Sequence, residues 1–128
     1  MKIEHVCLNV KDIEKEKSFY CQVFGFTCNQ KYHNDKTGWE NYFLCSGEGG
    51  ARLELLSHAE MPLQRAERNA TCIVHLSLAL GSQQKVKEIT EQIAAMGCEV
   101  LSYPRATGDG YYESSFLNPE GNMIELTV

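Results

Sequence analysis

The sequence contains one long pattern twice, and this duplication constrains the fold more than any other feature. A histidine on an expected strand recurs after 70 residues, a glycine that ends an expected helix after 72, and a glutamate on a later strand after 71. One repeat at so long an offset indicates an internal duplication rather than a short-period solenoid. The three pairs are His5 and His75, Gly25 and Gly97, and Glu54 and Glu125.

Each half is expected to contain one strand, one helix and three further strands. In the first half, strands are predicted at 3–10, 26–33, 39–45 and 51–56. The helix there runs from Asp12, which can cap it, to Phe24, before Gly25. In the second half, strands are predicted at 71–80, 98–103, 111–117 and 122–128, and Ser82 caps a helix that ends at Gly97.

The predicted fold is therefore α+β, with two βαβββ modules. We expect a single domain over 1–128, with module one at about 1–58, a linker at about 59–70 and module two at about 71–128. The linker is polar and contains Pro62. The helices should cover the apolar face of the sheet, and the opposite face should form a concave pocket.

Composition argues against several classes of function. The formal net charge is −5 and the basic residues are scattered, which disfavours nucleic acids and anionic membranes as partners. No apolar run approaches the ~20 residues of a membrane-spanning helix, and the first residues lack the apolar region of a signal peptide. We therefore expect a cytoplasmic protein whose six cysteines are reduced.

Four ionisable residues each lie next to an apolar residue on an expected strand. Strand alternation places each of them on the face opposite its apolar neighbours, as with Glu54 between Leu53 and Leu55. Ionisable groups in a pocket are costly unless they are paired or bind a metal. For any one of them alone, an ordinary polar role is the better interpretation, but the joint pattern favours a shared metal site. Its expected ligands are His5, Glu54, His75 and Glu125.

Two imidazoles and two carboxylates suit a divalent transition ion such as Zn, Ni, Fe or Cu, with Mn as a further possibility. A coordination number of five or six would leave room for a substrate with two neighbouring oxygens. The other candidates are weaker. His33 and His58 are interpreted as solvated surface residues, and Glu113 could line the pocket. Cys7 shares a face with His5, but no second histidine is available as its base.

The motifs that carry these residues resemble the vicinal oxygen chelate superfamily, which includes glyoxalases, bleomycin-resistance proteins and dioxygenases. The resemblance rests on residues 5–12, 18–20, 24–26 and 116–126, with sequences HVCLNVKD, SFY, FGF and FLNPEGNMIEL. It covers nearly the whole chain. It implies paired βαβββ modules that form a curved sheet around a metal and a substrate.

Within that superfamily, the order His–Glu–His–Glu resembles glyoxalase I, also called lactoylglutathione lyase. The resemblance implies a metal-dependent lyase or isomerase that acts through an enediolate on a 2-oxoaldehyde–thiol adduct. It favours one Zn or Ni per site, with Mn or Fe as alternatives. It also implies that Glu125 is the base, with Glu54 second, and that the protein is a homodimer. The ligands of one site could come from one chain or two.

Two positions depart from the bacterial glyoxalase I pattern. Asn9 stands where an arginine that helps to hold glutathione is usual, and His58 stands where an asparagine is usual. Glutathione is therefore not implied, and the substrate is expected to be a different thiol adduct or another small oxygenated molecule. The alternatives are an Fe(II) ring-cleaving dioxygenase, for which Glu54 would be redundant, and a metal-free ligand-sequestering protein, which typically lacks the ligand set.

Overall fold

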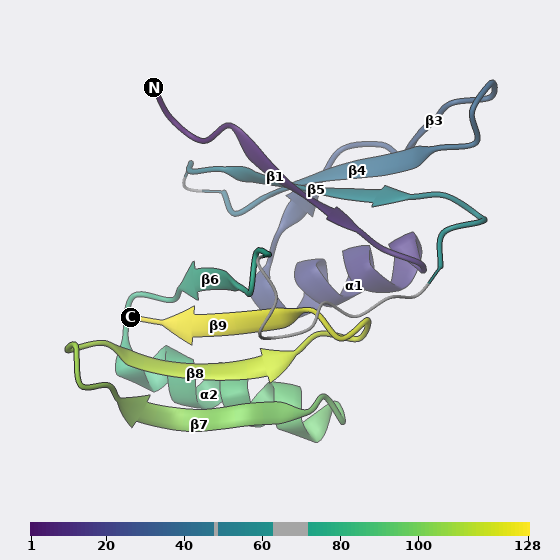
Figure 1. The fold of residues 1–128 in the computed structure, drawn as a ribbon. Coiled ribbons are helices and arrows are strands. Elements are labelled where there is room, and N and C mark those ends of the chain that lie inside the picture. The colour runs from purple at the N-terminus through teal and green to yellow at the C-terminus, as the bar shows by residue number, and fades with distance from the viewer. Residues whose placement is uncertain (48, 63–71) are drawn as a thin grey trace. The chain divides into compact units, whose positions relative to one another are not determined.

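The computed structural model describes residues 1–47, 49–62 and 72–128. The chain divides into two compact units, Met1–Leu63 and Gln64–Val128. Each unit consists of one mixed sheet packed against one helix (Figure 1). The predicted α+β class with a helix-backed sheet in each half is therefore confirmed. Most of the expected linker, from residue 63 on, lies outside the described residues, as does Thr71, the first residue of a predicted strand.

The first unit contains one helix, α1 (Ile13–Phe24), and a sheet in the order β1-β5-β4-β2, with β3 also paired to β4. The outer strand β1 runs parallel to β5, whereas β2, β3 and β5 are antiparallel to β4. The strands are β1 (His5–Asn9), β2 (Thr27–Cys28), β3 (Tyr32–His33), β4 (Glu40–Cys45) and β5 (Arg52–Ser57).

The strand predicted at 26–33 is divided into the two short strands β2 and β3. Asn29 lies in the gap, where its side-chain Oδ1 accepts the backbone N–H of Phe43 at 2.7 Å. A side chain thus takes the hydrogen bond that a regular ladder would supply from the backbone, and pairing with β4 resumes only at Tyr32.

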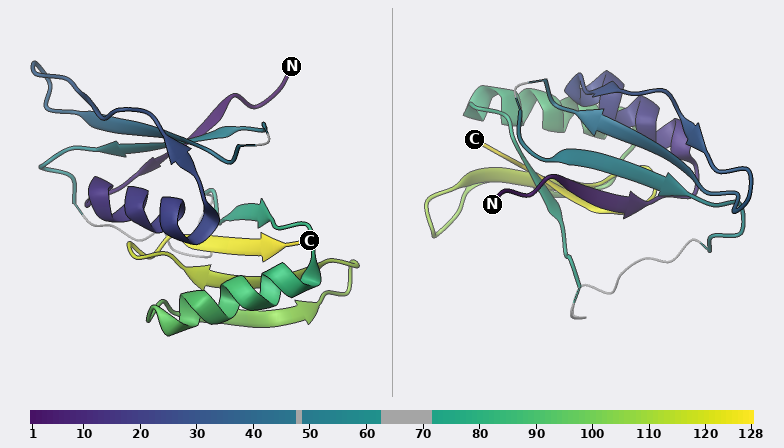
Figure 2. Two further views of the ribbon diagram at one scale, coloured as in Figure 1. Left: turned by 180° about the vertical axis from the view of Figure 1, so that it is seen from behind. Right: turned by 90° about the horizontal axis from the view of Figure 1, so that it is seen from above.

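The second unit contains α2 (Gln83–Ala95) and a sheet in the order β6-β9-β8-β7. β6 is parallel to β9, and the other neighbours are antiparallel. Figure 2 shows α2 lying along one face of this sheet. The strands are β6 (Leu76–Ala79), β7 (Val100–Ala106), β8 (Tyr112–Leu117) and β9 (Met123–Thr127).

Both helices begin and end at residues whose chemistry predicts a boundary. The Asp12 carboxylate accepts a backbone N–H at 3.0 Å at the start of α1, and the Ser82 hydroxyl does the same at 3.2 Å for α2. Gly25 follows α1 with φ 68° and Gly97 follows the cap of α2 with φ 83°. Only glycine adopts this left-handed conformation without a steric cost, so the two helices end where expected.

Each core lies between the helix and one face of its sheet. In β5 and β9 buried and partly exposed residues alternate, and Leu55 and Leu126 are fully buried. Glu54 and Glu125 precede these leucines and therefore lie on the face turned away from the helix, as predicted. Among the described residues, neither helix has the length and apolar character needed to cross a lipid bilayer.

Candidate metal site

The first unit brings together two of the four predicted ligands, His5 and Glu54. His5 Nε2 lies 3.6 Å from Glu54 Oε2. The parallel register of β1 and β5 sets Cys7 directly opposite Glu54, and His5 is two residues earlier on the same face of the sheet. The ring of His5 also packs edge-on against Phe43, with centroids 5.6 Å apart. The pair is thus positioned by strand register rather than by a loop.

The second unit brings together the other two predicted ligands, His75 and Glu125. The strand predicted at 71–80 is shorter in the structure, because β6 begins at Leu76, so His75 immediately precedes the strand. His75 Nε2 lies 3.8 Å from Glu125 Oε2. Ser77 stands directly opposite Glu125 in the parallel register of β6 and β9, and His75 is two residues before Ser77. The internal duplication inferred from sequence therefore extends to the geometry of these side chains.

The two pairs also match in exposure. The side chains of His5 and His75 are 41% and 39% exposed, and those of Glu54 and Glu125 are 14% and 19% exposed. In each pair a largely covered carboxylate faces a more accessible imidazole. Each pair therefore presents one nitrogen and one oxygen ligand toward solvent.

Each carboxylate is held at one oxygen, which leaves the other for the histidine. Asn41 Nδ2 donates to Glu54 Oε1 at 2.8 Å, and the Ser77 hydroxyl donates to Glu125 Oε1 at 2.8 Å. In both cases Oε2 is the atom that faces the imidazole Nε2. Neither donor was identified from sequence as a partner, because strand register is not readable from a single sequence.

A further carboxylate orients His5. Glu4 Oε2 lies 2.5 Å from His5 Nδ1, so Nε2 remains the nitrogen available to a metal. Glu4 also pairs with Arg52. The hydrogen bond with His5, assisted by Arg52 and opposed by desolvation, lowers the pKa of Glu4 below its ordinary value. An ionised carboxylate behind an imidazole is the arrangement that metal-ligating histidines commonly have.

The surroundings of Cys7 disfavour its thiolate form. Burial, together with the charge of Glu54 and a hydrogen bond to it, raises the pKa of the Cys7 thiol to about 11. Because of this pKa, the Cys7 thiol stays protonated near neutral pH. The reactive form of cysteine is the thiolate. The place of Cys7 opposite Glu54 makes it part of the wall around the first pair.

The separations within each pair suit a shared metal ion. Two ligands with bonds of ~2.0–2.2 Å to one tetrahedral ion lie roughly 3.4 Å apart, close to the observed 3.6 and 3.8 Å. Within the described part of either unit, no three His, Cys, Asp or Glu side chains gather to hold a metal. A site with all four ligands needs both pairs, and it stays a prediction.

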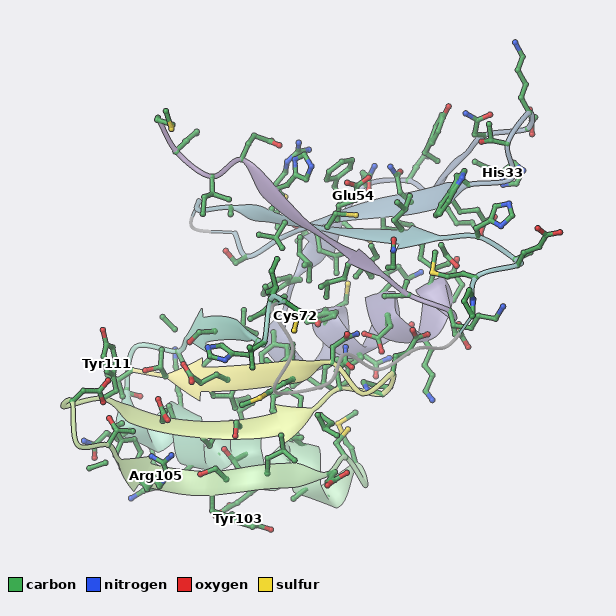
Figure 3. The ribbon with its side chains drawn as sticks, in the orientation of Figure 1. His33, Glu54, Cys72, Tyr103, Arg105 and Tyr111 are labelled. Atoms are coloured by element: carbon green, nitrogen blue, oxygen red, sulfur yellow. The ribbon has the colours of Figure 1, made fainter. Side chains whose placement is uncertain are left out.

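The remaining histidines of the first unit lie elsewhere. His33 Nδ1 contacts Glu40 at 3.1 Å, and Figure 3 shows His33 at the far end of the sheet from Glu54. His58 stacks near Trp39, with ring centroids 5.1 Å apart. Both histidines line a surface pocket of about 470 Å³, in which Lys31 pairs with Glu14 and Glu40. In the second unit, Glu113 pairs with Arg105 at 3.5 Å.

The sequence matches one protein-family model, and the fold matches those of solved structures. Residues 2–126 match the model of the Glyoxalase/Bleomycin resistance protein/Dioxygenase superfamily. No curated protein sequence matches the chain.

Solved structures with the same fold cover the chain almost completely. A glyoxalase family protein from Enterococcus faecalis is 22% identical, with a TM-score of 0.79 over 99% of this chain and 97% of that one. A glyoxylase/bleomycin resistance protein/dioxygenase domain from Frankia sp. EAN1pec is 16% identical, with 0.85 over 100% and 97%. The trypanothione-dependent glyoxalase I of Leishmania major is 18% identical, with 0.78 over 99% and 86%. At these identities the likeness shows the fold alone.

Proposed function

Since the chain belongs to the Glyoxalase/Bleomycin resistance protein/Dioxygenase superfamily, we propose that it is a metal-dependent lyase or isomerase of the glyoxalase I type. Its substrate is a small molecule with neighbouring hydroxyl and carbonyl oxygens, of the 2-oxoaldehyde–thiol adduct class. The observation that carries the proposal is the equivalent histidine–glutamate pair in each unit, at 3.6 and 3.8 Å. Two such pairs supply the complete nitrogen and oxygen donor set of a divalent ion.

The proposed ligands are His5, Glu54, His75 and Glu125, with Zn or Ni favoured and Mn or Fe as alternatives. A bound divalent ion would supply Lewis-acid polarisation of the substrate oxygens. The donors behind each pair would keep the ligating atoms aimed while substrate enters.

Glu125 is the proposed base, and its hydrogen-bond partner supports that role. It would take the acidic C–H proton of the adduct and return it to the neighbouring carbon, by way of an enediolate. The Ser77 hydroxyl donates to ionised Glu125 and can accept from the protonated acid, so the contact survives proton transfer. Asn41 Nδ2 only donates, which suits a Glu54 that stays ionised as a ligand.

The thiol of the adduct is proposed to be other than glutathione. Asn9 lacks the cationic group that the bacterial pattern supplies, and His58 is engaged within its own unit by Thr37 and Trp39. The trypanothione-dependent glyoxalase I with this fold is an example of a different thiol. We further propose that the protein is a cytoplasmic homodimer, a state that the family resemblance supports. Light scattering tests the dimer by measuring its mass in solution.

Elemental analysis of purified, metal-reconstituted protein tests the proposal. We expect about one Zn, Ni, Mn or Fe per chain, lost in His5→Ala and in Glu125→Ala. His33→Ala is the matched control, because His33 contacts a glutamate outside both pairs, and it should retain the metal. Isomerase activity toward 2-oxoaldehyde–thiol adducts should follow metal content.

Wild-type protein that binds no divalent metal after reconstitution would overturn the lyase assignment and favour a ligand-sequestering protein. Metal binding with O₂-dependent ring cleavage, and without adduct isomerisation, would instead support the Fe(II) dioxygenase alternative.

A further inference from the structure

Two cysteines meet where α1 leads into β2. Cys21 lies in the last turns of α1, and its carbonyl oxygen accepts the backbone N–H of Gly25 at 3.1 Å. Gly25 takes up a left-handed conformation and the chain reverses, so that the next strand returns beside the helix. Cys28 ends that strand.

Strand register independently places Cys28 on the helix side of the sheet. Cys28 pairs with Leu44 of β4, which is fully buried on the face that α1 covers. Residues directly opposite one another share a face, so the Cys28 side chain points toward the helix. The two thiols lie near enough for Cys28 to act on the electrostatics of the Cys21 thiol.

The two thiols also differ in access. Cys28 is exposed and Cys21 is partly buried. Burial and the contact with Cys28 raise the pKa of the Cys21 thiol. A small oxidant would therefore reach Cys28 first and leave Cys21 as the second thiol to react.

We propose that Cys21 and Cys28 form a redox-sensitive dithiol that low-molecular-weight disulfides oxidise to an intramolecular disulfide. The Cys28 thiolate attacks one sulfur of the small disulfide, forms a mixed disulfide and releases one small thiol. The Cys21 thiolate then attacks the Cys28 sulfur and releases the second small thiol. Two electrons pass to the oxidant, and the protein gains one sulfur–sulfur bond between α1 and β2. Neither cysteine belongs to the histidine–glutamate pairs, so the inference is independent of the proposed activity.

Peptide mapping after equilibration with oxidised glutathione tests the proposal. Trypsin should release residues 18–31, which follow Lys17, end at Lys31 and contain Cys21 and Cys28 but no other cysteine. In the wild type this peptide should become lighter by two hydrogens, and the protein should lose two of its six titratable thiols. A thiol reductant should reverse both changes.

Single variants separate the steps. Cys21→Ser should stop at the mixed disulfide, with one glutathione retained on Cys28. Cys45→Ser is the matched control, because Cys45 pairs with Thr27 in the same strand pair but lies on the opposite face from Cys28, and it should still form the bond. Wild-type protein that keeps an unmodified 18–31 peptide would overturn the proposal. So would oxidation that joins a different pair of cysteines.

Discussion

In both units a glutamate on the last strand faces a histidine. The residue opposite the glutamate on the neighbouring strand is Cys7 or Ser77, and the histidine lies two residues before it. The contacts that support the two glutamates differ. Glu54 is held by the amide of Asn41 and faces a histidine backed by Glu4. Glu125 is held by the hydroxyl of Ser77. The parallel strand pairing beside each glutamate corresponds in the two halves, and the neighbouring side chains differ. The difference fits the proposed division of roles, in which Glu54 is a fixed ligand and Glu125 is the group that exchanges a proton.

Exchanging each glutamate for glutamine should separate these roles most strongly. Glu125→Gln keeps an oxygen that can ligate but removes the base, so kcat should fall by about 100- to 10,000-fold at saturating metal. Glu54→Gln should weaken metal affinity more than it lowers kcat. Steady-state kinetics and metal titration on both variants measure the difference. Equal losses of kcat in both variants would contradict the division of roles.

Truncation of the leucine that follows each glutamate should show whether the two cores are equally well packed. Leu55 and Leu126 are both fully buried against the helix of their unit. Leu55→Ala and Leu126→Ala should each reduce the free energy of unfolding by about 2–5 kcal/mol. Urea denaturation measures both values. A loss below about 1 kcal/mol in one variant would show that its core collapses around the missing side chain.

Removing the two donors should have a smaller effect than removing the glutamates. Asn41→Ala should weaken metal binding by about 10- to 100-fold, because Glu54 loses the contact that aims Oε2. Ser77→Ala should lower kcat, and Ser77→Thr, which keeps a hydroxyl, should restore it. Metal titration and kinetics on the three variants test this. Identical behaviour of Asn41→Ala and Ser77→Ala would remove the distinction between the two units.

The smallest expected effect concerns a charge cluster in the first unit. Hydrogen bonds from Lys17, Tyr42 and Lys31 lower the pKa of Glu14 to about 2. An unfolded glutamate has a pKa of about 4.3, so this stabilisation is complete above that pH and is lost as pH falls toward 2. Because Glu14 is half exposed, the contribution should stay below about 1 kcal/mol.

Unfolding of the wild type and of Glu14→Gln, near neutral pH and at about pH 3, measures this contribution. The difference in free energy between the two proteins should shrink in acid. A difference that grows as the pH falls would contradict the sign of the pKa shift.

Much of the fold, and the sheet face on which each candidate ligand lies, could be predicted from the sequence. Caps at Asp12 and Ser82, glycines after both helices and strict alternation around Glu54 and Glu125 are local signals, and local chemistry determines where elements begin and which face a side chain takes. The duplication related His5 to His75 and Glu54 to Glu125. The structure adds that His5 meets Glu54 and His75 meets Glu125.

Other features were decided only by tertiary structure. The division of 26–33 into β2 and β3 depends on Asn29 meeting Phe43, a contact between strands. The donors Asn41 and Ser77 reach their glutamates because particular residues stand beside one another on paired strands. Register is set by packing and hydrogen bonding between segments distant in sequence. Alternation alone therefore identifies the face on which a ligand lies, whereas the atom that holds it depends on the folded sheet.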